Sequence, residues 1–88
     1  MKQVLYHHSE EKHAMWQLGV LPQAPLVFEN GDLARRFKNT VIPDTDWGDE
    51  WEPYAIDADE LEKLCRPYGG YYLQPEPTRF AWVPLGVK

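Results

Sequence analysis

Proline and glycine divide this chain into short apolar segments, and this punctuation limits the elements that it can form. Eight prolines and six glycines are spread over 88 residues. Proline breaks the interior of a helix and glycine commonly ends one, so the pattern predicts short strands and short helices. No apolar run approaches the roughly 18 residues of a membrane-spanning helix. We therefore expect a single small domain over residues 1–88.

Five apolar segments have the length and composition of short strands. Pro53 lies within one of them, which places that strand at a sheet edge or at a strand start. The final two segments are separated by a turn that contains Pro75 and Pro77. The predicted strands are Lys2–His7, Leu26–Phe28, Trp51–Ile56, Tyr71–Leu73 and Arg79–Val83.

Three short helices are predicted between these strands. Ser9 is a typical N-cap for a helix that runs to about Leu18. A second helix is expected over Leu33–Lys38, where the apolar residues have helical spacing. Asp57–Glu60 has the spacing of a capping box, so a third helix is expected from about Ala58. The fold class is therefore α+β, with about three short helices packed on a mixed or antiparallel sheet.

The charge of the chain is unevenly distributed. Nine acidic residues and no lysine or arginine fall between Asp44 and Glu62, whereas the rest of the chain carries nine basic and five acidic residues. Binding to phosphates needs a basic footprint, so this distribution disfavours nucleic acid as a direct ligand. It favours a basic protein surface, or a cation, as the partner.

Aromatic residues alternate with the carboxylates of the acidic segment 44–62, notably Trp47, Trp51 and Tyr54. Aromatic side chains commonly anchor an interface, while charges around them set orientation and the rate of encounter. Alternatively, the acids solvate a loop and a helix face, and the tryptophans belong to the core. The candidate partner-binding residues are Asp44, Asp46, Trp47, Asp49, Glu50, Trp51 and Glu52.

The sequence lacks the residue patterns of the common catalytic and metal sites. It contains no phosphate loop, no GxSxG and no dinucleotide fingerprint. His7 and His8 are neighbours that point to opposite faces of a strand, and no HxH or HExxH spacing includes His13, so we expect no metal site. Cys65 falls near the end of a predicted helix, where the dipole disfavours a thiolate. These observations argue against an enzyme.

One segment resembles a known family. Val4-Leu5-Tyr6-His7-His8-Ser9 is similar to the opening strand of the ADP-ribosyltransferase-like superfamily, which often begins LYHGTS. The expected order of elements is similar as well. The resemblance implies NAD as a cofactor, with His7 contacting its ribose. His8 stands where the family usually has glycine, and no glutamate opens the strand at Tyr71, so a minimal or inactive relative is implied as readily as an enzyme.

Two main functions follow from these observations, and a third is a structural subunit of a larger assembly whose interface the aromatic residues cover. The first is a small acidic interaction protein that binds a basic surface of a partner, with inhibition of a nucleic-acid-handling enzyme by charge mimicry as one form. The alternative is an ADP-ribosyltransferase-like domain that binds NAD through His7. The first 13 residues lack the apolar stretch of a signal peptide, so we expect a cytoplasmic protein.

Overall fold

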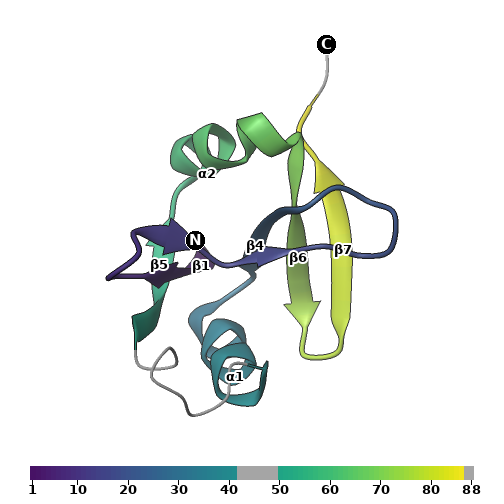
Figure 1. Ribbon diagram of the computed structural model, residues 1–88. Coiled ribbons are helices and arrows are strands. Elements are labelled where there is room, and N and C mark those ends of the chain that lie inside the picture. Colours follow the sequence, from purple (N-terminus) through teal and green to yellow (C-terminus); the bar gives the residue numbers. More distant parts are fainter. Residues whose placement is uncertain (42–49, 87–88) are drawn as a thin grey trace.

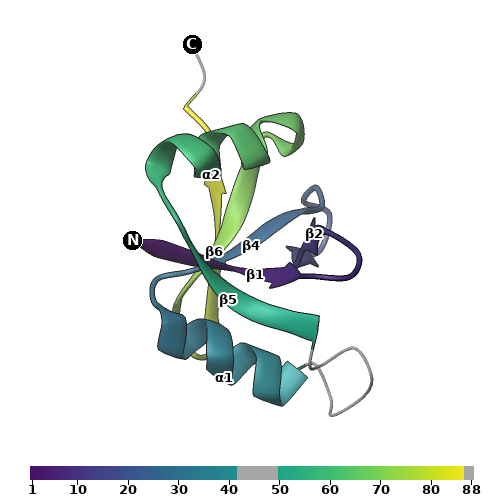
Figure 2. The same ribbon diagram turned by 90° about the vertical axis from the view of Figure 1, so that its left-hand side faces the viewer.

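The computed structural model describes residues 1–41 and 50–86 of the chain. They form one mixed sheet with a helix on each face (Figures 1 and 2). The strands are β1 (Lys2–His7), β2 (Lys12–His13), β3 (Met15–Trp16), β4 (Ala24–Phe28), β5 (Trp51–Ile56), β6 (Gly70–Glu76) and β7 (Arg79–Pro84). This architecture confirms the α+β class.

The sheet is mostly antiparallel, and its main path runs β2-β1-β4-β6-β7. β4 and β6 form a parallel pair, with Val27 opposite Leu73. β5 lies against β1 along its whole length, with Pro53 opposite Leu5, and β3 pairs with β4. Within the described residues β5 pairs with no other strand, so Pro53 stands on an edge, where its missing N–H breaks no ladder.

Two α-helices cover opposite faces of the sheet. α1 (Gly31–Val41) begins where the side-chain oxygen of Asn30 accepts a hydrogen bond from the backbone N–H of Leu33 at 3.0 Å. α2 (Ala58–Cys65) begins where the carboxylate of Asp57 accepts from the N–H of Glu60 at 2.8 Å. Figure 1 shows α2 above the sheet and α1 below it.

A core lies under each helix. Leu5, Leu26, Phe28 and Tyr72 of the sheet pack with Phe37 of α1 in the larger core. Val4, Val27 and Ile56 pack with Leu61 and Cys65 of α2 in the smaller one. Because neighbouring strand residues point to opposite faces, β4 contributes to both cores and is buried at all five positions.

The helix predicted from Ser9 to about Leu18 is wrong, so the described chain has two α-helices rather than three. The segment turns back at Glu11, whose φ is +50°, and forms β2 and β3 instead. Ala14 donates its N–H to Leu5 at 2.9 Å and accepts one from Leu26 at 2.9 Å. In a helix these N–H and C=O groups would bond to each other within the segment. Here they bond to neighbouring strands, so tertiary pairing overrides the local helical signal.

Candidate functional site

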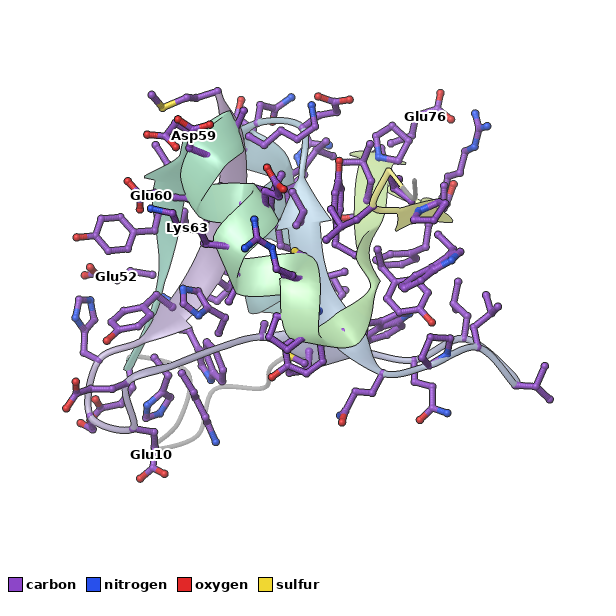
Figure 3. The ribbon with its side chains drawn as sticks, turned by 90° about the horizontal axis from the view of Figure 1, so that it is seen from above. Glu10, Glu52, Asp59, Glu60, Lys63 and Glu76 are labelled. Atoms are coloured by element: carbon purple, nitrogen blue, oxygen red, sulfur yellow. The ribbon has the colours of Figure 1, made fainter. Side chains whose placement is uncertain are left out.

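Exposed carboxylates gather on the flank of the molecule formed by β5 and α2. Figure 3 shows Glu52, Asp59 and Glu60 along one side, with Lys63 among them, whereas Glu76 lies on the opposite side. We call Glu50, Glu52, Asp59 and Glu60 the acidic flank. Of these, Glu52, Asp59 and Glu60 are exposed and Glu50 is half-buried. The exposed carboxylates of this flank therefore project into solvent from β5 and α2.

The turn between β1 and β2 holds the carboxylates of Glu50 and Glu52. The Nε2 of His8 lies 2.8 Å from an Oε of Glu52, and the hydroxyl of Ser9 donates to the carboxylate of Glu50. The backbone N–H of His8 also donates to the carbonyl of Glu50 at 3.1 Å. These contacts limit the rotamers of both glutamates and hold their carboxylates in place.

An exposed tyrosine stands beside these carboxylates. Tyr54 is 58% exposed and lies two residues after Glu52, so both side chains project from the same face of β5. Its ring lies 5.9 Å from that of Tyr6, which in turn lies 5.5 Å from the ring of His8 and 5.2 Å from that of His13. Tyr54 was not among the predicted site residues, although its spacing from Glu52 could have placed it there.

Trp51 points away from this surface. It is half-buried, packs against the larger core and meets the ring of His7 edge to face at 4.9 Å. Lys12 lies over the same indole at 6.0 Å. Trp51 therefore anchors β5 to the larger core, and Glu52 beside it carries an exposed carboxylate. The other predicted partner-binding residues lie outside the described residues: Asp44, Asp46, Trp47 and Asp49.

His7 lies inside the sheet rather than on the acidic flank. Its side chain is 2% exposed, and its Nδ1 accepts the backbone N–H of Glu10 at 3.0 Å. A contact between His7 and the ribose of NAD stays a prediction, and such a contact needs the imidazole to become accessible. Over the ranges 1–41 and 50–86, no three His, Cys, Asp or Glu side chains are placed to hold a metal ion together.

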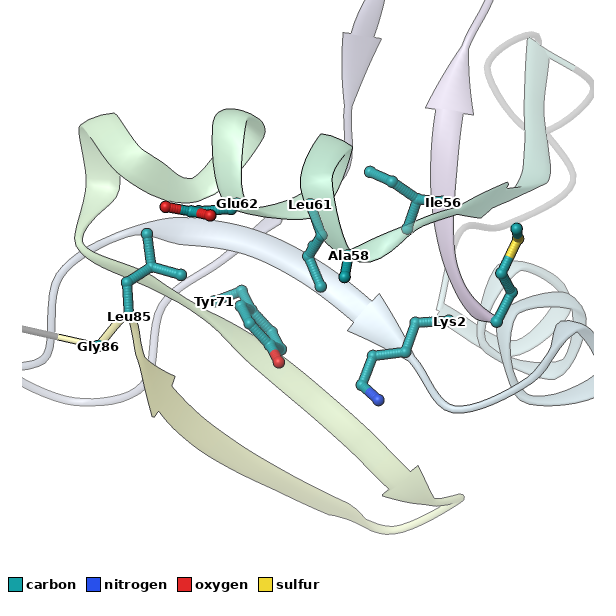
Figure 4. A pocket seen from close by; sticks show the side chains of 9 residues that line it. Lys2, Ile56, Ala58, Leu61, Glu62, Tyr71, Leu85 and Gly86 are labelled. Atoms are coloured by element: carbon teal, nitrogen blue, oxygen red, sulfur yellow. The ribbon is translucent and has the colours of Figure 1, made fainter.

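A pocket of about 600 Å³ opens on the other side of α2 (Figure 4). Its apolar wall includes Ile56, Leu61 and Leu85, and Lys2 and Tyr71 supply polar groups. Burial raises the pKa of the Tyr71 hydroxyl above its ordinary value of 10. The pocket suits an apolar group that ends in a hydrogen-bond acceptor.

Comparison with known proteins finds no matching protein-family model, no matching curated protein and no matching solved structure. Neither α1 nor α2, the two α-helices within residues 1–41 and 50–86, is long and apolar enough to cross a membrane.

Proposed function

We propose that this protein is an interaction protein that binds a basic surface of a partner protein through the acidic flank and Tyr54. The observation that carries the proposal is the exposure of Tyr54 beside Glu52 on an edge strand. Tyrosine combines a large apolar ring with a polar tip and is enriched among residues that dominate binding energy. An interface built on it explains why a large ring is left in water.

The charges around Tyr54 determine which partners fit. Glu52 precedes Tyr54 by two residues on β5, and Figure 3 shows Asp59 and Glu60 of α2 on the same side of the molecule as Glu52. Such a surface attracts cationic partners over a Debye length of about 8–10 Å at physiological ionic strength and repels acidic ones. Where the basic surface of the partner is a nucleic-acid-binding groove, the bound flank would occupy it and inhibit the partner.

The test uses the full chain, tagged, to capture proteins from a lysate of its host, followed by measurement of affinity for the captured protein. We expect a basic partner whose association rate falls as salt increases. Glu50→Gln/Glu52→Gln should slow association, and Tyr54→Ala should speed dissociation because it removes the anchor. Adding DNA or RNA as a competitor tests whether the partner's nucleic-acid-binding groove is the surface that is occupied.

A matched control removes the same charge elsewhere. Glu29→Gln/Glu76→Gln also neutralises two exposed glutamates, and Glu76 lies far from the acidic flank in Figure 3. This control should bind like the unmodified chain. Equal affinities for the control, for Glu50→Gln/Glu52→Gln and for Tyr54→Ala would overturn the proposal.

A further inference from the structure

A second, smaller pocket lies on the α1 face of the sheet, away from the acidic flank. Its volume is about 300 Å³, and α1, β3, β6 and β7 all contribute to its walls. Trp16, Phe37 and Phe80 supply aromatic rings to these walls, and Gln74 supplies a side-chain amide. Arg36 and Thr40 of α1 are exposed and stand at its rim.

The walls of this pocket are largely aromatic. The ring of Trp16 stacks on that of Phe80 with centroids 5.0 Å apart and planes 16° apart. Phe37 meets Trp16 edge to face at 5.6 Å and Phe80 at 6.0 Å. Rigid rings at fixed angles form flat apolar surfaces against which another flat ring packs well.

Two polar atoms of the pocket's lining residues are buried without a hydrogen-bond partner in the described part of the chain. They are the indole Nε1 of Trp16, which can only donate, and the side-chain oxygen of Gln74, which can only accept. The orientation of the Gln74 amide is fixed, because its Nε2 donates to the carbonyl of Pro77 at 2.7 Å. Rotating the amide by half a turn would place the side-chain oxygen of Gln74 against the carbonyl oxygen of Pro77, and two acceptors repel each other.

Such atoms are uncommon in folded proteins, because an unsatisfied buried donor or acceptor is costly. Gln74 is only 3% exposed, so water in bulk does not satisfy it. This donor and this acceptor belong to two residues that line the same aromatic pocket, and a ligand that carries both an acceptor and a donor would match them. A ring with adjacent C=O and N–H groups carries both in a flat shape.

We propose that this pocket binds a planar aromatic amide, whose C=O accepts from Trp16 and whose N–H donates to Gln74. The ring of the ligand packs against Phe37 and Phe80, and the rim at Arg36 accommodates a substituent that reaches solvent. Entry requires a small displacement of the side chains that cover the two polar atoms. The proposal is independent of the acidic flank, which lies on the other face of the sheet.

The probe is 2-quinolone, a flat lactam, and its control is N-methyl-2-quinolone, which keeps the ring and the C=O but lacks the N–H. Binding is followed by ¹H–¹⁵N NMR on the full chain. We expect 2-quinolone to shift the indole N–H signal of Trp16 and the side-chain NH₂ signals of Gln74. N-methyl-2-quinolone should bind about tenfold more weakly, the factor that corresponds to one lost hydrogen bond.

Trp16→Phe identifies the indole signal and tests the donor, because phenylalanine keeps a ring against Phe80 and removes the N–H. It should weaken binding of 2-quinolone about tenfold. Trp82→Phe is the matched control, because Trp82 lies outside this pocket, and it should leave binding unchanged. The comparison of the two quinolones on the unmodified chain remains decisive if Trp16→Phe fails to fold. Equal binding of both probes, or no shift of the Trp16 signal, would overturn the proposal.

Discussion

Gly70 of β6 faces Val83 of β7 so closely that a Cβ on Gly70 would lie 2.5 Å from the carbonyl oxygen of Val83. The same Cβ would also meet the Trp82 ring at 2.8 Å. We therefore expect Gly70→Ala to lower the free energy of unfolding by roughly 1–3 kcal/mol or more, because backbone and ring must both move. Urea unfolding followed by tryptophan fluorescence measures the change.

Gly86→Ala serves as the control for this substitution. A Cβ at Gly86 meets nothing within 4 Å, so the replacement should change stability by less than about 0.5 kcal/mol. If Gly70→Ala is equally harmless, the close approach of β6 and β7 is not a constraint on the fold.

The N-cap of α2 gives a second prediction. Asp57→Ala removes the acceptor for the N–H of Glu60 and should cost about 1 kcal/mol of unfolding free energy. Asp57→Asn retains a side-chain oxygen and should restore most of the loss. Thermal unfolding of the three proteins in parallel checks this. Equal destabilisation by alanine and asparagine would show that the charge, not the cap, matters.

The stability of the fold should depend on pH through His13. Partial burial lowers the pKa of His13 below 6.5, so the unfolded chain takes up a proton at higher pH than the folded protein does. The free energy of unfolding should therefore decrease as the pH falls below about 6.5, and His13→Gln should reduce this decrease. Unfolding in urea at pH 7.5 and at pH 5.5 measures it. The unmodified chain, unfolded at the same two pH values, is the comparison. Identical pH dependence with and without His13 would contradict the prediction.

Cys65 should be unreactive in the folded protein. Its side chain is 0% exposed, and burial raises the pKa of the thiol to about 11, so little thiolate exists at pH 8. We expect a thiol reagent such as DTNB to react on the order of 100-fold more slowly than with the urea-unfolded chain, because reaction requires opening. Similar rates for the two states would place Cys65 at the surface.

Much of the fold was predictable where the local and the tertiary signals agree. The residues of β1, β5 and α2 show this agreement, and the start of α2 at Ala58 follows from the capping spacing of Asp57. The edge position of β5 follows from Pro53, which cannot donate to a ladder. In each case one local physical constraint leaves few other arrangements.

The segment from Ser9 to Leu18 was not predictable from its own residues. Ser9 is a good N-cap, and Met15 and Leu18 have helical spacing, so the local signal indicates a helix. The choice of a turn depends instead on the backbone groups of Leu5 and Leu26, which lie outside the segment and bond to Ala14 in the sheet. A single sequence does not show this pairing.

The candidate site was predictable in part. The acidic window identified Glu50 and Glu52 as candidate binding residues, and the structure shows both held by the turn between β1 and β2. The orientation of Trp51 and Tyr54 depends on which face of β5 is buried. The register between β5 and β1 decides which face is buried. A shift of one residue would turn Trp51 and Tyr54 each to the opposite face of the sheet.

The burial of β4 in both cores has a consequence for hydrogen exchange. The sheet face under α1 and the face under α2 share this one strand, so neither core can be fully exposed while β4 keeps its neighbours. The amide protons of β4 should exchange with solvent only through global unfolding, whereas the ends of α1 and α2 exchange through local fraying. The protein therefore has two helices that can loosen one at a time and one strand whose release unfolds the whole molecule.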